Sequence, residues 1–177
     1  MLKMILSLVL ATSVIHAGLS QPTAVAEHQV GAQGAMDLAA VREKDFDVTS
    51  LDGQQIKLAQ LLGTKQPVVI NFWATWCAPC RSEIPHLVEL AQKHQKQGLI
   101  VVGLTIEKPD KDRGKVKEFM QKYKINYPVA FAPDSVYRFF NGDSEHIAVP
   151  RVFVFAADAH LVNRFGKYYG SRTRHSC

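Results

Sequence analysis

The sequence is poor in cysteine, in long apolar runs and in net charge. Its 177 residues include three cysteines, too few for the disulfide framework of a small secreted domain. The uncharged run from Met4 to Ile15 is shorter than the roughly 20 residues that a membrane-spanning helix needs. The net charge of +5 comes from scattered lysine and arginine without interleaved aromatic residues, so we expect no nucleic-acid partner. What remains is a chain of ordinary globular composition, long enough for one well-buried domain.

Residues 1–26 have the pattern of an export signal. Lys3 precedes the apolar run, and the segment closes on Ala-Val-Ala, a cleavage pattern that would free a mature chain beginning near Glu27. The alternative is an uncleaved amino-terminal anchor, and only in that case do we expect contact with a membrane. Residues 27–42 are small and polar and are expected to form a linker, followed by one folded domain over residues 43–177. The expected location is therefore periplasmic, or otherwise outside the cytoplasm.

The periodicity of apolar residues in this domain predicts strands that alternate with helices. Continuous runs of β-branched and aromatic residues indicate two strands buried on both faces, and turn residues mark the hairpins. This order predicts an α/β fold, a three-layer sandwich with a central mixed sheet and an N-terminal β-hairpin extension. In chain order we expect a hairpin around Asp52-Gly53, a short helix at 58–62, a buried strand at 67–73, a helix ending at Gly98, a buried strand at 99–106, a helix at 113–124, a strand at 127–132, a helix at 134–140 capped by Asp134, and a closing hairpin over 151–166.

Cys77 and Cys80 lie between the first buried strand and a predicted helix start. There, unpaired backbone N–H groups and the helix dipole stabilise a thiolate, which would lower the pKa of Cys77 from about 8.5. Pro79 suits the first helical turn because its φ is already fixed. Cys80, on the same helix face, could then attack a mixed disulfide on Cys77 and release the reduced partner. The spacing therefore favours thiol–disulfide exchange.

Two structural roles for the cysteine pair remain open at this point. Zinc normally takes four ligands, and His86 and His94 lie too far along the helix to share a tetrahedron easily with both sulfurs. A purely structural disulfide would close a very short loop and add little stability. We expect no metal and no cofactor.

Glu83 lies one helical turn beyond Cys80. A partly desolvated carboxyl group at this position could take the proton from Cys80 or return it. The alternative is an ordinary first-turn carboxylate that supports the helix dipole. Of the two nearby tryptophans, we expect Trp73 in the core and Trp76 at the edge of the site.

The segment NFWATWCAPCRSEIP (71–85), with LDGQQIKLAQLLG (51–63) before it and Val149-Pro150 after it, resembles the exported TlpA/ResA-like thiol:disulfide oxidoreductases of bacteria, which have a thioredoxin-like fold. The resemblance runs from about residue 43 to residue 170. It implies that Cys77 is the exposed nucleophile, that Cys80 resolves the mixed disulfide by forming Cys77–Cys80, and that Glu83 is the active-site acid. It also implies a cis-proline at Pro150 that faces the cysteines and presents backbone to an incoming peptide; an ordinary trans proline is the alternative. The substrate-contacting residues that follow are Trp76, Ala78, Pro79, Val149, Pro150 and Arg151.

By this resemblance the protein would exchange disulfides with client proteins that carry cysteine pairs, more as a reductant than as an oxidant. Apocytochrome c before haem attachment is the example from the family, and a membrane thiol protein would supply the electrons. Two rival functions are a Cu(I) carrier, since soft thiolates suit that ion, and a peroxiredoxin-like peroxidase. The peroxidase site needs a proline and a Thr or Ser ahead of its cysteine, and Thr75 has no such proline upstream.

The sequence departs from the family pattern at four places, of which one is a long loop, NGDSEH (141–146), ahead of the proline. Arg151 follows the proline where the family usually has a small or hydroxyl residue, which would change substrate choice. The sequence stops about ten residues after the last expected strand, where related proteins carry a further helix, so we expect that helix to be missing and that face of the sheet to be poorly covered. Cys177 has no counterpart in the family.

Overall fold

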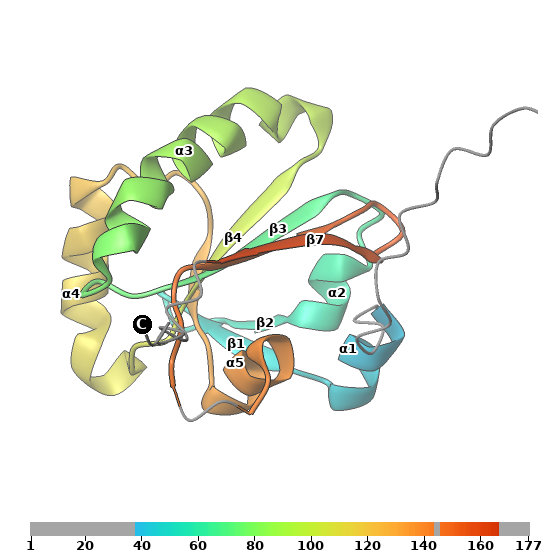
Figure 1. Cartoon of the computed structure of the whole chain (residues 1–177), viewed down its shortest axis with the longest axis horizontal. Helices are drawn as coiled ribbons and strands as arrows, with labels where there is room; N and C mark the ends of the chain where they lie inside the picture. Colours follow the sequence, from blue (N-terminus) through green and yellow to red (C-terminus); the bar gives the residue numbers. More distant parts are fainter. Residues whose placement is uncertain (1–37, 144–145, 167–177) are drawn as a thin grey trace, which may run out of the picture. The chain divides into compact units, whose positions relative to one another are not determined.

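The computed structural model describes residues 38–143 and 146–166. Their strands form one mixed sheet in the order β2-β1-β5-β4-β3-β6-β7 (Figure 1). The strands are β1 (Asp47–Ser50), β2 (Gln55–Lys57), β3 (Val68–Trp73), β4 (Ile100–Thr105), β5 (Val129–Phe131), β6 (Arg151–Phe155) and β7 (Leu161–Gly166). The helices are α1 (Leu38–Lys44), α2 (Leu58–Leu62), α3 (Ala78–His94), α4 (Pro109–Lys122) and α5 (Asp134–Asn141), and a short 3₁₀ turn, η1 (Gln95–Gln97), follows α3.

Strand β3 is the centre of the fold. All six of its residues are buried, and it pairs in parallel with β4 and antiparallel with β6. A strand with neighbours on both edges and helices on both faces has no solvent-facing side, which explains its continuous apolar sequence. The prediction of a central buried strand at this position is confirmed, as is the mixed sheet.

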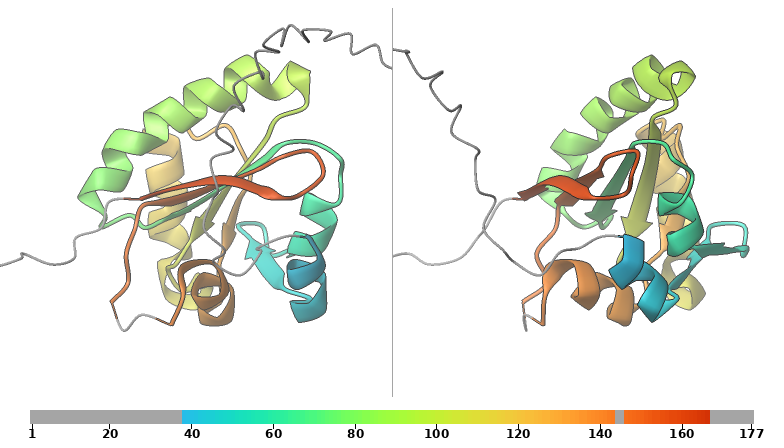
Figure 2. Two further views of the ribbon diagram at one scale, coloured as in Figure 1. Left: turned by 45° about the vertical axis from the view of Figure 1, so that its right-hand side comes forward. Right: turned by 90° about the vertical axis from the view of Figure 1, so that its right-hand side faces the viewer.

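Helices cover both faces of the sheet, so the predicted three-layer sandwich is confirmed. Side chains alternate along β3: Ile70 and Phe72 pack in the core beneath α1, α2 and α5, whereas Val69 and Trp73 pack beneath α3 and α4. Figure 1 shows these two groups of helices on either side of the strands. Strand β7 ends near the amino-terminal end of α3, and the turn of the β6–β7 hairpin lies at the opposite end (Figure 2). Both cysteines of the motif belong to the core on the α3 side.

Three local expectations need correction. The linker expected over residues 27–42 overlaps α1, whose Val41 is fully buried; one helical turn of apolar residues was too short a signal to show this. Helix α4 begins at Pro109, four residues before the expected start, because proline fits the first helical position and the Asp112 side chain accepts the Lys108 N–H at 3.2 Å. Asp134 is the first residue of α5 and caps nothing, since its carboxylate pairs with Lys108 at 2.7 Å.

Strand β7 lies at the outer edge of the sheet, and five of its six residues are exposed. Predictions about the missing last helix and Cys177 fall on residues 167–177, outside the described residues, as does the export segment 1–26. Within residues 38–143 and 146–166, no helix has the length and apolar character to cross a membrane.

Candidate active site

The disulfide lies at the amino terminus of α3, at the edge of the sheet where β3 ends. Cys77 is the cap residue of the helix, and its sulfur accepts a hydrogen bond from the backbone N–H of Cys80 at 3.2 Å. The two cysteines are joined as a disulfide. After reduction, the same N–H and the helix dipole would stabilise negative charge on the Cys77 sulfur. The arrangement is the one expected from the sequence.

Accessibility differs from the expectation. Cys77 is 3% exposed and Cys80 is fully buried, so Cys77 is the more accessible sulfur, but it is not the exposed group that the family resemblance implied. Trp76 directly precedes Cys77 in the chain, and its side chain is 59% exposed. Trp73 is fully buried in the core, as predicted. In this oxidised form, an attacking thiolate can therefore reach the disulfide only at the small exposed part of Cys77.

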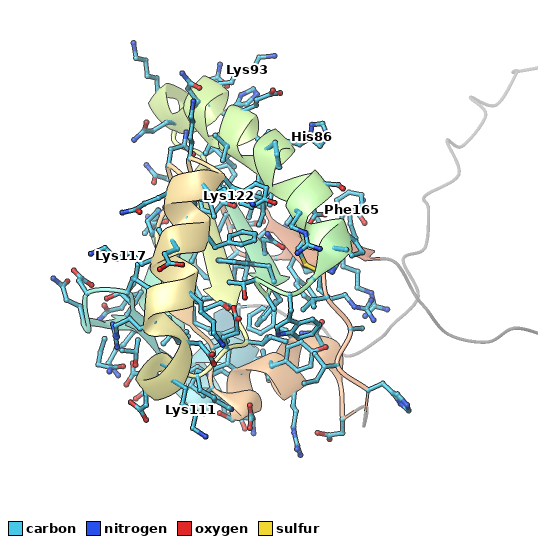
Figure 3. The ribbon with its side chains drawn as sticks, turned by 90° about the vertical axis from the view of Figure 1, so that its left-hand side faces the viewer. His86, Lys93, Lys111, Lys117, Lys122 and Phe165 are labelled. Atoms are coloured by element: carbon cyan, nitrogen blue, oxygen red, sulfur yellow. A yellow bond between two sulfur atoms is a disulfide. The ribbon has the colours of Figure 1, made fainter. Side chains whose placement is uncertain are left out.

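A groove runs beside the disulfide between α3 and the end of β7. Its volume is about 760 Å³. Figure 3 shows His86 on α3 and Phe165 of β7 beside the first turn of that helix. The peptide bond between Val149 and Pro150 is cis, as predicted, and Pro150 forms part of the groove wall. The groove is lined by Ala78, Pro79, Ser82, Glu83, His86, Pro150, Phe165 and Gly166.

The groove brings together four of the predicted site residues, namely Ala78, Pro79, Glu83 and Pro150. Arg151 is placed elsewhere. It lines a separate cavity of about 260 Å³ with Phe140, Phe153 and Arg164, because consecutive strand residues point to opposite faces of the sheet. Arg151 does not line this groove, but its side chain packs against Gly166, and Phe165 and Gly166 line both hollows.

Glu83 is half-buried on α3, one turn beyond Cys80. Burial raises the pKa of its carboxyl group, and the charge of the nearby His86 lowers it by a smaller amount. A carboxyl group with a raised pKa holds and releases protons closer to neutral pH than a solvated one. The environment thus fits the predicted proton acceptor for Cys80.

Glu107 is a site residue that the sequence reasoning missed. It is the second residue after the end of β4 and is only 8% exposed. Its carboxylate accepts hydrogen bonds from the Thr75 N–H at 3.0 Å, from the Thr75 hydroxyl, and from the Thr105 hydroxyl at 3.0 Å. Glu107 thereby holds the loop that carries Trp76 and Cys77. An acidic residue at the carboxyl end of a buried parallel strand was the available signal, because adjacent parallel strands end at the same edge.

Tyr137 holds the segment before the cis-proline in a similar way. Its hydroxyl donates to the Ala148 carbonyl oxygen at 3.0 Å and accepts from the Ala148 N–H at 2.7 Å. The ring packs edge-on against Phe72 at a centroid distance of 5.7 Å. Nothing in the sequence separated this tyrosine from an ordinary core residue of α5.

In the part of the chain that the structure describes, no cluster of three or more His, Cys, Asp or Glu side chains is placed to hold a metal ion.

Comparison with known sequences covers most of the folded domain. Residues 41–164 match the AhpC/TSA family. Over 86 residues the chain is 38% identical to the thiol-disulfide oxidoreductase ResA of Bacillus anthracis, which covers 49% of this chain and 47% of ResA. The chain thus spans about half the length of such curated relatives.

Solved structures are similar over a larger share of the chain. A thiol:disulfide interchange protein of the thioredoxin family from Chlorobium tepidum TLS is 31% identical, with a TM-score of 0.58, over 72% of this chain and 83% of that chain. A secreted disulfide oxidoreductase of Mycobacterium tuberculosis, homologous to E. coli DsbE, matches 75% of this chain and 89% of its own with a TM-score of 0.59; at 22% identity it supports the fold alone. The chain belongs to the AhpC/TSA family of thioredoxin-like proteins, and about half of it is similar to the thiol-disulfide oxidoreductase ResA.

Proposed function

We propose that the protein exchanges disulfides with client proteins through Cys77 and Cys80, as a reductant outside the cytoplasm. The observation that carries the proposal is the Cys77–Cys80 disulfide at the start of α3, with the Cys80 N–H directed at the Cys77 sulfur. That geometry favours a thiolate on Cys77 and keeps the resolving sulfur within bonding reach.

The reaction would proceed in two exchanges. The Cys77 thiolate attacks one sulfur of a client disulfide, so a Cys77–client bond forms and the other client sulfur leaves as a thiolate. Cys80 then gives its proton to Glu83 and attacks Cys77, and the second client sulfur leaves with its electron pair. The client gains two electrons, and the protein ends as the Cys77–Cys80 disulfide. An upstream dithiol donor must then reduce that disulfide for a second turnover.

Clients would be held at the groove and the exposed apolar side chains around it. Trp76 precedes the nucleophile in the chain and Ile147 precedes the cis-proline segment, and both are exposed. Exposed apolar side chains next to a reactive centre suit contact with an unfolded or extended segment. Pairing of such a segment with the backbone before Pro150 would add hydrogen bonds that do not depend on client sequence.

The client class and the location rest on similarity. Two solved relatives are described as secreted, one from Mycobacterium tuberculosis and one from Corynebacterium glutamicum, and residues 1–26 have the pattern of an export signal. Reduction of apocytochrome c before haem attachment is the client reaction that we propose, with a membrane thiol protein as electron donor.

The decisive experiment replaces Cys80 with serine. Without the resolving thiol, the variant should accumulate as a mixed disulfide with clients through Cys77, and dithiothreitol should release them. Cys77→Ser is the matched control and should trap none. A reduction potential of about −270 mV would support a reductant, whereas about −120 mV would indicate an oxidant. A Cys80→Ser protein that traps no client, beside a wild type that neither reduces a disulfide substrate nor oxidises a dithiol substrate, would contradict the proposal.

The same samples separate the two rival functions. A copper carrier should bind Cu(I) stoichiometrically in the reduced form and lose it in Cys77→Ser and in Cys80→Ser alike. A peroxidase should consume peroxide at a rate comparable with its disulfide exchange. In the structure the Thr75 hydroxyl donates a hydrogen bond to the Glu107 carboxylate. This hydroxyl is therefore already engaged, which does not favour a role in binding peroxide.

A further inference from the structure

A second cavity lies beside the groove, on the α5 side of the β6–β7 hairpin. Its volume is about 260 Å³, and we call it the arginine cavity because Arg151 and Arg164 line it together with Phe140, Asn141 and Phe153. The end of β7 completes its wall through Phe165 and Gly166, which also line the groove beside the disulfide. The two hollows therefore share one wall.

The pairing of β6 with β7 brings the two arginines to the same face of the sheet. Gly166 is opposite Arg151, and Arg164 is opposite Phe153. The arginines are thus diagonal neighbours, a separation that long side chains can span. The Arg151 side chain crosses Gly166, since a Cβ atom on Gly166 would lie 2.5 Å from Arg151 Cδ and 3.1 Å from its Nη1. A glycine at this position leaves the room that Arg151 occupies.

The remaining wall of the arginine cavity is apolar or neutral. Phe140 of α5 packs against Phe153 at a centroid distance of 5.2 Å, and both rings are buried. Among the described residues that line the cavity there is no Asp or Glu, and Asp143, two residues beyond Asn141, is exposed. Apolar walls lower the local dielectric constant, which strengthens the attraction between a guanidinium group and an anion. The cavity is therefore suited to an anionic group.

A carboxylate is the anion of a protein client that this arrangement fits. A guanidinium group has five N–H donors in a planar fork and binds a carboxylate through two parallel hydrogen bonds. Both arginines also interact with the rest of the chain, but one such interaction does not use all five donors. Two guanidinium groups side by side can hold one Asp or Glu side chain between them.

We propose that the arginine cavity binds an acidic side chain of the client, so that Arg151 and Arg164 select client segments with an Asp or Glu near the reacting cysteine. The inference rests on the exchange function proposed above, because it names the substrate class of that reaction. A client segment that pairs with the backbone before Pro150 would reach the cavity over the end of β7, where Phe165 and Gly166 border both hollows. Neither arginine takes part in the exchange of sulfur bonds.

The test compares disulfide-bonded peptides that differ by one charge. In each peptide a single Glu is moved along the sequence on either side of the cysteine, and a peptide with Gln at the same place is the reference. At one position the wild type should reduce the Glu peptide with a kcat/KM about fivefold above that of the Gln peptide, as expected for a partly solvated ion pair. This preference should shrink as the salt concentration rises. Arg151→Gln and Arg164→Gln should each lose it.

Arg138→Gln is the matched control. Arg138 is exposed on α5 and does not line the cavity, so this variant loses the same charge and should keep the preference. Arg164 is exposed on the edge strand β7, so Arg164→Gln tests the proposal without disturbing the core. Equal kcat/KM for Glu and Gln peptides at every position would overturn the proposal, as would an equal loss of preference in Arg138→Gln and Arg164→Gln.

A second readout does not depend on exchange. The preferred Glu peptide, with serine in place of cysteine, is titrated into the wild type, and the ¹⁵N NMR signals of the arginine Nε–H groups are followed. The signals of Arg151 and Arg164 should move and that of Arg138 should not, whereas the Gln peptide should move none. Unmoved signals with the Glu peptide would overturn the proposal. If these signals move but the wild type exchanges no disulfides, the proposed function fails and the cavity is still a carboxylate site.

Discussion

Replacement of Glu107 by alanine should loosen the loop that carries the nucleophile. Three donors would lose their acceptor: the Thr75 N–H, the Thr75 hydroxyl and the Thr105 hydroxyl. Thr105 is fully buried, so its hydroxyl cannot turn to solvent, whereas Thr75 is half-buried and can. The change should therefore cost both stability and the rate of exchange.

The magnitude follows from the number of buried donors. A buried donor without an acceptor costs about 1–3 kcal/mol. If the full cost is counted for the Thr105 hydroxyl and part of it for the Thr75 N–H, the free energy of unfolding falls by about 2–4 kcal/mol. With a urea dependence of about 2 kcal/mol per M, the unfolding midpoint should fall by about 1–2 M. Glu107→Gln should lose less than about 1 kcal/mol, because its amide oxygen can accept from Thr75 and Thr105 while its NH₂ donates to the Thr75 hydroxyl.

The assay is urea unfolding of the oxidised proteins, followed by the rate at which each reduced protein reduces a disulfide substrate. Glu118→Ala is the control, since Glu118 is exposed on α4 and such substitutions usually change stability by less than about 0.5 kcal/mol. Equal midpoints for Glu107→Ala and Glu118→Ala would refute the reasoning. The reasoning would also be refuted if Glu107→Gln were as unstable as Glu107→Ala, because the loss would then not come from missing hydrogen-bond acceptors for Thr75 and Thr105.

Three further predictions concern the acid, the cis-proline segment and export. Burial raises the pKa of Glu83, so the folded protein binds more protons than the unfolded chain above the ordinary glutamate pKa, and stability falls as pH rises through that window. Glu83→Gln should slow exchange but have a higher free energy of unfolding than wild type near pH 7, and this difference should vanish at lower pH. A stability difference that is the same near pH 7 and at lower pH would mean that Glu83 is an ordinary helix-start carboxylate. Tyr137→Phe keeps the ring but loses both bonds to Ala148, which should lower stability by about 1–2 kcal/mol and raise KM for a client more than it lowers kcat; a change in kcat alone would argue against a binding role. Amino-terminal sequencing of the exported fraction should find a chain beginning near Glu27, and an intact Met1 in the cytoplasm would contradict export.

Local sequence was sufficient for most elements and for the cysteine pair. The run at 68–73 could only be a strand with both faces covered, and Pro79 directly after Ala78 predicted the helix start that places Cys77 at a cap. It was insufficient for α1, since a seven-residue helix with one buried residue leaves little periodic signal. It also misjudged the exposure of Cys77, because burial depends on which segments pack over the sulfur and not on its position in the helix.

The sequence by itself determined the strands and helices after α1, in chain order, together with the α/β class and the chemistry of a Cys-x-x-Cys pair at a helix start, because each depends on neighbouring residues in the chain. Only the tertiary structure decided that Glu107 holds the loop of Thr75, that Tyr137 holds Ala148, and that Trp73 and Tyr127 pack beside Gly103. Each of these contacts joins different elements of the sheet and its helices. Hydrophobic periodicity shows which face of an element is buried, but the pairing of β3 with β4 and of β4 with β5 decides which side chains from other elements meet that face.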